Sequence, residues 1–231
     1  MTVTTAFLAL WNDLAPGREA EYDTWHTREH VPERVAARGF RSGRRYVCQA
    51  HPAHRWFTLY DVADLGCFGT PEYLDLLNNP TPWSAAMRPD FRNFLRVPCA
   101  ELGTAGFGIG AALAVLRLLP DDAALPMLGE LATAEGMVRA RLGSRADTAV
   151  ASGGFRAGAA GTGASDEFNT VLLLEALDHD AAARAFAQAA ARLLRGTPPL
   201  EAGGVYDLAF LFPGADLAER DAHRRSGWRR S

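Results

Sequence analysis

The sequence predicts an α+β fold in which two tandem ferredoxin-like βαββαβ units close into a pseudo-dimeric α+β barrel. Strand-like and helix-like segments follow one another in the order βαββαβ, which is the split-βαβ pattern. The same order recurs further along the chain, with matching elements offset by roughly 95 to 115 residues. One such unit leaves a sheet face and a sheet edge uncovered, and pairing two sheets face to face covers them.

The first unit is expected over residues 1–103. Its first strand is an apolar run that ends at a group of strand-breaking residues beginning with Asn12. The next segment has early acidic residues, which suit a helix N-terminus; Pro32 kinks or restarts this helix, and Gly39 ends it. A stretch broken by prolines and bearing Trp83 precedes the last strand. The expected elements are strands at 6–11, 40–48, 56–62 and 91–97 and helices at 18–30 and 71–78.

The second unit is expected over residues 104–215 and is predicted to act as scaffold. A linker is expected at 101–108, and the glycine- and alanine-rich stretch 151–165 is expected to be a mobile loop. Residues 216–231 are predicted to form a basic, flexible tail. The expected elements are strands at 110–119, 137–142, 169–177 and 205–212 and helices at 123–135 and 179–194.

Composition and charge narrow the class of protein. Apolar residues make up 48% of the 231 residues and charged residues 22%, which is ordinary for a globular protein with a real core. A net charge of -3 gives no support to nucleic-acid binding. No apolar stretch reaches the roughly 18 residues that a transmembrane helix needs, so no membrane partner is expected. The three cysteines form no CxxC pair and no signal-peptide pattern is visible, so we expect a cytoplasmic protein.

The helix expected at 18–30 carries the residues best suited to chemistry. At about 100° per residue, Tyr22, Trp25, His26, Glu29 and His30 fall within an arc of roughly 140°. The opposite face is polar, so the face with the two aromatic residues is expected to turn toward the sheet and to carry the ionisable groups inward. Buried imidazoles and carboxylates have shifted pKa values, which suits His26, Glu29 and His30 to proton transfer as catalytic residues.

The helix motif has two other interpretations, and a glycine-rich segment elsewhere in the chain needs one of its own. In a purely structural cluster, Glu29 accepts a hydrogen bond from a histidine or from an arginine of the next strand. Residues 26–30 also spell H-x-x-E-H, the inverted zinc-protease pattern. No metal is predicted there, because Pro32 disturbs the helix and no acidic third ligand follows in a helical context. The glycines at 106–110 precede a strand and therefore lack the context of a nucleotide-binding fingerprint.

The segment from Tyr22 to Arg34, followed by Gly39-Phe40 and Arg44-Arg45-Tyr46, resembles the opening of the EthD-like members of the dimeric α+β barrel superfamily. His26 and His30 fall in the histidine positions of that motif. The resemblance implies a barrel of two ferredoxin-like units with small, often aromatic or hydrophobic molecules bound between sheet and helices. Relatives include small monooxygenases, polyketide cyclases and dehydratases, isomerases and haem-binding enzymes. Both units lie in one chain here, so barrel closure needs no homodimer, and self-association as a homo-oligomer stays open.

Three functions follow. The first is a cofactor-independent enzyme that acts by His/Glu acid–base chemistry on a small hydrophobic carbonyl or polyketide-like substrate, of the cyclase, dehydratase, isomerase or monooxygenase type. In it, a histidine is the general base, Glu29 orients the imidazole and Arg45 stabilises an oxyanion. The alternatives are a non-catalytic small-molecule-binding or stress-associated module, and a haem-binding enzyme with His26 or His30 as axial ligand. The residues expected to bind the substrate are Tyr22, Trp25, Arg45, Tyr60 and Trp83.

Overall fold

The computed structural model describes residues 5–48, 50–51, 53–119, 123–146, 168–194 and 202–214. The first half follows the predicted order βαββαβ, with short additional helices. Its strands are β1 (Ala6–Leu14), β2 (Phe40–Val47), β3 (Trp56–Val62) and β4 (Phe91–Gly106). Its helices are α1 (Glu19–Trp25), α2 (Val31–Val35), α3 (Pro71–Asn78) and α4 (Pro82–Met87). A π-helical turn (His26–His30) joins α1 to α2, and 3-10 turns lie at Leu65–Gly69 and Arg88–Asp90.

The second half has the same order of elements. Its strands are β5 (Ala112–Leu118), β6 (Met137–Arg145), β7 (Thr170–Ala176) and β8 (Gly203–Pro213), and its helices are α5 (Ala124–Thr133) and α6 (His179–Leu193). The loop expected at 151–165 and the tail expected at 216–231 lie outside the described residues.

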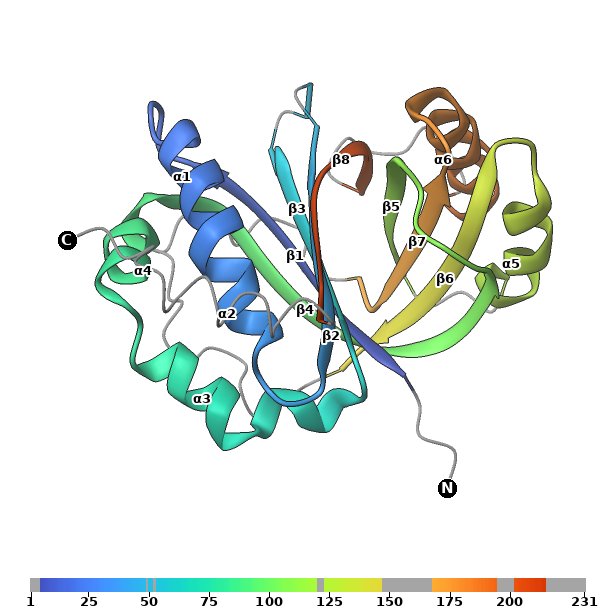
Figure 1. Cartoon of the computed structure of the whole chain (residues 1–231). Helices are drawn as coiled ribbons and strands as arrows, with labels where there is room; N and C mark the ends of the chain where they lie inside the picture. The colour runs from blue at the N-terminus through green and yellow to red at the C-terminus, as the bar shows by residue number, and fades with distance from the viewer. Residues whose placement is uncertain are drawn as a thin grey trace.

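The strands form one closed barrel in the order β1-β3-β2-β8-β5-β7-β6-β4 (Figure 1). Within each half the order is that of a ferredoxin-like sheet, and the two sheets join where β2 pairs with β8 and where β4 pairs with β6. Every neighbouring pair is antiparallel. The predicted α+β barrel is confirmed. No helix in the described ranges is long and apolar enough to cross a membrane.

The alternation of side chains along the strands separates an inner and an outer face. On β3, Phe57 and Leu59 point into the barrel and pack with side chains of both halves, among them Tyr206. Thr58 and Tyr60 alternate with these two residues along the strand. They face the opposite way, toward the helices of the first half. Helices α5 and α6 cover the outer face of the second half with alanine and leucine side chains (Figure 1). The barrel core is therefore common to both halves, and each outer face has its own helical layer.

A buried ion network crosses one end of the barrel interior. The guanidinium of Arg44, which is 0% exposed, donates to Glu175 at 2.7 Å and to Asp61 at 2.7 Å. Arg141 donates to the other oxygen of Asp61 at 2.6 Å and to Glu101 at 2.6 Å. Burial alone raises the pKa of Asp61, but the charges of Arg44 and Arg141 outweigh it and lower the pKa to about 2. The network ties together strands from both halves, so its contacts hold the barrel closed.

Two expected boundaries differ from the structure. The linker predicted at 101–108 was wrong for 101–106, because these residues continue β4 and pair with β6. Barrel closure explains this: the first part of β4 pairs with β1 and its last part must reach the second half. The predicted unit boundary at residue 103 thus falls inside a strand. Strand β1 continues past the predicted end at residue 11 to Leu14, because Asn12 pairs with β3.

Gly39 does not end the helix as predicted, because α2 ends at Val35 with Ala36 as its C-cap, and Gly39 lies in the turn that leads into β2. Its backbone nevertheless requires glycine. Its φ is +89°, and a Cβ at this position collides with the Sγ of Cys67. Gly39→Ala is expected to lower the free energy of unfolding by about 2–4 kcal/mol, from left-handed strain plus overpacking. Gly17→Ala is the matched control, because Gly17 has φ +83° but no atom within 4 Å of the place where a Cβ would lie. Urea unfolding of both variants checks this; equal losses would rule out the contribution of Cys67.

Candidate functional site

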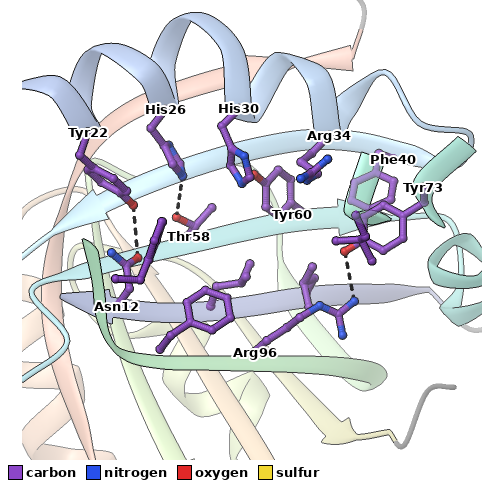
Figure 2. A pocket seen from close by; sticks show the side chains of 15 residues that line it. Asn12, Tyr22, His26, His30, Arg34, Phe40, Thr58, Tyr60, Tyr73 and Arg96 are labelled. Atoms are coloured by element: carbon purple, nitrogen blue, oxygen red, sulfur yellow. Dashed lines mark hydrogen bonds between the residues drawn. The ribbon is translucent and has the colours of Figure 1, made fainter. Parts of the chain in front are cut away.

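A pocket lies between the outer face of the first-half sheet and helices α1, α2 and α3 (Figure 2). The space between its walls is about 520 Å³ when the open solvent at its mouth is included. Its walls are mostly apolar and aromatic, with a few polar groups that converge on the space, which is the usual character of a small-molecule site. The lining residues are Leu8, Leu10, Asn12, Tyr22, His26, His30, Arg34, Phe40, Thr58, Tyr60, Tyr73, Leu77, Phe91, Phe94 and Arg96.

Four side chains at a spacing of four residues form the helical wall of the pocket: Tyr22, His26, His30 and Arg34 (Figure 2). In an uninterrupted α-helix each step of four residues turns the side chain by about 40°, so such a row drifts around the helix. Here the middle of the row is a π-helical turn, in which the N–H of Val31 donates to the carbonyl of residue 26, five residues back. The wider turn reverses part of the drift. All four side chains therefore point into the same space.

Pro32 is the local cause of this turn. Proline lacks an N–H and its ring clashes with the carbonyl four residues before it, so the regular α-helical bond to residue 28 cannot form. The sequence predicts a kink or restart at Pro32, and the structure has neither a break nor a gap. The helix instead absorbs the proline by widening between α1 and α2. π-Bulges of this kind occur frequently at functional sites.

The two histidines are held in their neutral form. Burial lowers the pKa of His26 well below its usual value, and the positive charge of Arg45 lowers it further. Burial likewise lowers the pKa of His30, with contributions from Arg34 and from the neighbouring histidine. Their ring centroids lie 5.4 Å apart, and the ring of His30 packs against Trp25 at 4.3 Å. Both imidazoles are therefore unprotonated at neutral pH, each with a lone pair on one ring nitrogen.

Several buried polar atoms around the pocket have no hydrogen-bond partner among the described residues. They are Nδ1 of His26, Nδ1 of His30, Nη1 of Arg34 and the hydroxyl of Tyr60. Burial raises the pKa of Tyr60, so its hydroxyl keeps its proton and remains a donor. Buried polar groups are nearly always satisfied in folded proteins, so these groups that converge on one cavity are sites for the polar atoms of water or of a ligand.

Two further contacts order the other end of the pocket. The hydroxyl of Tyr22 donates to the side-chain oxygen of Asn12 at 3.2 Å, and Nε2 of His26 lies 3.4 Å from the hydroxyl of Thr58 (Figure 2). Asn12 and Thr58 come from β1 and β3, so the sheet fixes the orientation of the helical wall. His26 is thus already engaged through one nitrogen, whereas His30 has no such contact with the sheet among the described residues.

Four of the eight predicted site residues line the pocket: Tyr22, His26, His30 and Tyr60. The other four are neighbours that hold it together. Glu29 accepts hydrogen bonds from Thr81 and Ser84, and Trp25 donates to Ser84. Trp83 donates to Glu21, and Arg45 donates to the carbonyl of Asp23 at 3.2 Å.

The contacts of Glu29 change its expected role. Among the described residues it makes no hydrogen bond to either histidine, so the geometry does not support its predicted function of orienting an imidazole. The π-helical turn rotates Glu29 away from the row, and its carboxylate instead fastens α4 to the helix. No three His, Cys, Asp or Glu side chains of the described ranges gather into a metal-binding group.

Sequence reasoning missed five residues of the pocket that carry polar groups: Asn12, Arg34, Thr58, Tyr73 and Arg96. One of them had a signal. Arg34 continues the four-residue spacing of the histidines beyond Pro32, where the helix was expected to kink or restart. The others come from strands and a helix far along the chain, and only the strand register brings them to the same space.

Comparison with solved structures places this chain among α+β barrel proteins. A protein described as anthrone oxidase-like is 12% identical with a TM-score of 0.58, covering 92% of this chain and 94% of that chain. A protein from Fusobacterium nucleatum, provisionally described as a monooxygenase, is 10% identical with a TM-score of 0.57, covering 92% and 96%. A haem-binding protein from Thermus thermophilus is 12% identical with a TM-score of 0.50, covering 96% and 94%. No protein-family model and no curated protein sequence matches the chain. At these identities the likeness establishes the ferredoxin-like α+β barrel fold.

The buried histidines make stability depend on pH. Burial lowers the pKa of His54 to about 4, and those of His26 and His30 fall well below the usual value of about 6.5. The unfolded chain therefore binds more protons than the folded protein below about pH 6.5, so the free energy of unfolding falls as the pH falls. Each group contributes about 1.4 kcal/mol per pH unit within its window.

Urea unfolding between pH 7.5 and 5 measures this slope. His30→Gln should reduce the slope of the free energy of unfolding against pH, and substitution of the exposed His179 should leave it unchanged. Equal slopes for the wild type and His30→Gln would contradict the buried neutral state of His30.

Proposed function

We propose that the pocket binds a small, flat, largely apolar molecule with a carbonyl group and removes a proton from the carbon beside that carbonyl, without a cofactor. The observation that carries the proposal is the pair of buried, neutral imidazoles of His26 and His30 in an apolar cavity that also holds an unpartnered donor, the hydroxyl of Tyr60. A base for carbon acids needs a neutral nitrogen shielded from water, and the developing oxyanion needs donors fixed in advance.

In the proposed reaction His30 is the general base. Its imidazole takes the proton, and the electron pair of the broken C–H bond moves to the carbonyl oxygen, which becomes an enolate. The hydroxyl of Tyr60 then donates to that oxygen. His30 is preferred over His26 because the latter already contacts Thr58. Arg45, which was predicted to stabilise an oxyanion, does not line the pocket and acts on His26 through its charge.

The enolate has several onward reactions. Reprotonation at another atom gives an isomerase, loss of a leaving group gives a dehydratase, attack on a second carbonyl gives a cyclase, and reaction with O₂ gives an oxidase or monooxygenase. The descriptions of the structural neighbours, anthrone oxidase-like and monooxygenase, favour the last of these for proteins of this fold. A shared fold does not fix a reaction, so the support for this chain rests on its own pocket.

Deuterium exchange into anthrone tests the proposal. Anthrone is a flat ketone with an acidic methylene group, and in D₂O under argon its exchange requires proton abstraction only. The wild-type protein is expected to accelerate the loss of the methylene proton signal over buffer by about 10²-fold or more. A variant of the exposed His179 is the control for unspecific catalysis by surface histidines and should match the wild type. No acceleration with anthrone or with a smaller ketone such as 2-tetralone would overturn the proposal.

Haem binding is the second candidate, and the unpartnered Nδ1 of His30 favours it. An axial ligand is a neutral imidazole with a free nitrogen beside an apolar cavity, and His30 fits that description. Bound haem supplies one-electron and oxygen chemistry, which the protein tunes through the axial ligand and the polarity of the pocket. The Thermus thermophilus neighbour is described as haem-binding. A titration with haemin decides: a saturable one-to-one shift of the Soret band that His30→Ala abolishes supports haem, and no shift eliminates it.

We further propose that the chain is a tandem, EthD-like form of the barrel, with the site unit at 1–103 and a scaffold unit at 104–215. The equal strand orders of the two halves support it, as does the apolar packing of α5 and α6 where the first half has its pocket. In this arrangement the second half supplies the sheet on which the site unit closes. Self-association into a homo-oligomer is not required for the site, and sedimentation analysis measures it directly.

A further inference from the structure

Two guanidinium groups enter the pocket from opposite walls. Arg34 lies on the helical wall in α2, and Arg96 lies on the sheet wall in β4 (Figure 2). No aspartate or glutamate is among the described residues that line the pocket. Because a buried positive charge is costly unless a counter-charge or hydrogen bonds compensate it, this combination calls for a partner.

The compensation of Arg34 within the protein is incomplete. Its side chain is 4% exposed, and the nearest oxygen of Glu33 lies 3.7 Å from Nη1, beyond hydrogen-bond distance. Glu33 also acts on the guanidinium of Arg88. Burial and the charge of Arg34 lower the pKa of Arg88, and the charge of Glu33 raises it. One carboxylate thus serves two guanidinium groups. Nη1 of Arg34 is left without a hydrogen-bond partner in the described part of the chain.

Arg96 has aromatic rings and one hydroxyl as neighbours. It donates to the hydroxyl of Tyr73 at 3.1 Å, and its guanidinium lies over the rings of Phe68 at 5.3 Å and Tyr73 at 5.9 Å. No carboxylate of the described residues forms an ion pair with it. Its Nε is buried and lacks a hydrogen-bond partner there. Ring faces hold the guanidinium in place, and its charge stays available to a ligand.

The strand register sets the distance between this charge and the imidazoles. Arg96 pairs with Leu10, and Leu10 pairs with Thr58, the residue beside His26. Two strand spacings of about 4.8 Å therefore separate the backbones of Arg96 and Thr58 by about 10 Å. Apolar side chains, Leu10 and Phe94 among them, line the pocket along with these groups. A ligand that reaches from the imidazoles to Arg96 has the length of two fused aromatic rings.

We infer that the molecule bound in this pocket carries a carboxylate or an equally acidic group, which Arg34 binds from the helical wall and Arg96 from the sheet wall. This inference rests on the proposed function and adds the charge class of its substrate: a bicyclic or larger aromatic acid with a carbonyl. Arginine suits the task, because its planar fork matches a carboxylate in two parallel hydrogen bonds. The apolar side chains of the pocket hold the rings, and the two guanidinium groups hold the acidic group.

Calorimetric titration of a matched pair of ligands tests the inference. The pair is 2-naphthoate and 2-naphthamide, which share shape and size and differ in charge. Wild-type protein is expected to bind the acid about tenfold or more tightly than the amide, and added salt should narrow the gap. Arg96→Met and Arg34→Met are each expected to bring the two affinities to within about threefold. Arg92→Met, an exposed arginine on the same strand, is the matched control and should keep the wild-type preference.

Each outcome decides the matter. Equal affinities for acid and amide in the wild type, no binding of either, or a preference that survives both pocket substitutions would overturn the inference. The wild-type comparison needs no variant, so it stands even if Arg34→Met fails to fold. Acid preference without deuterium exchange would overturn the proposed function and leave the anion site. Deuterium exchange without acid preference would overturn the anion site and leave the proposed function.

Discussion

His30→Gln is expected to slow deuterium exchange into anthrone by about 10²-fold or more relative to the wild type. Glutamine keeps much of the volume and the hydrogen-bonding ability of histidine, but its amide does not accept a proton at neutral pH. The expected effect is large because the proposed scheme gives the proton no other acceptor, and burial keeps the wild-type imidazole unprotonated. Proton nuclear magnetic resonance follows the methylene signal over time for both proteins.

Two further variants separate the base from its surroundings. His26→Gln is expected to slow exchange less, since one nitrogen of His26 already contacts Thr58. Tyr60→Phe removes a donor to the enolate and is expected to slow exchange by about 10-fold or more without changing its pH dependence. Thermal unfolding of each variant reports whether it is folded. A folded His30→Gln protein that exchanges at the wild-type rate would show that the base lies elsewhere.

Arg44→Met is expected to lower the free energy of unfolding by about 3–5 kcal/mol. The substitution leaves the carboxylate of Glu175, which is 1% exposed, with only the N–H of Gly110 as a hydrogen-bond partner among the described side-chain contacts. It also removes one of the two arginines that hold Asp61 ionised. Removing one member of a buried ion network costs more than the pair contributes, because the remaining charge stays buried without compensation.

An exposed ion pair provides the comparison for Arg44. Nη1 of Arg192 and Oε1 of Glu130 form an ion pair at 2.7 Å, but both side chains are about half exposed to solvent. Arg192→Met is therefore expected to change the free energy of unfolding by less than about 1 kcal/mol. Urea denaturation of both variants gives the two values under the same conditions. A loss for Arg44→Met as small as that for Arg192→Met would mean that the network contributes little to barrel closure.

The order of elements could be predicted from the sequence. That the barrel closes could also be predicted, but not which residues of β4 and β6 pair to close it. Period-two and period-3.6 patterns mark strands such as β3 and helices such as α6, and each half repeats them. The pairing of β4 with β6 has no local signal, because residues 101–106 contain two glycines and read as a linker. Their strand conformation comes from the partner strand, which is a tertiary effect.

Half of the residues predicted for the site line the pocket, and the misses have the same physical cause. The helical pattern identified His26 and His30 correctly as pocket residues, since local periodicity governs which face a helix buries. It placed Glu29 on that face by assuming 3.6 residues per turn, and the π-helical turn removed it. Arg96 is brought in by strand register more than sixty residues away from the helix, and no local pattern announces such a contact.

The charge state of the two imidazoles is the most direct test of this account. Heteronuclear magnetic resonance of protein with isotope-labelled histidine reports the protonation of each ring as the pH is lowered. We expect the signals of His26 and His30, assigned through their glutamine variants, to remain those of neutral rings below pH 6.5. Both should shift when 2-naphthoate is added. Ordinary titration of both rings near pH 6.5 would contradict the buried, neutral pair on which the proposed proton abstraction depends.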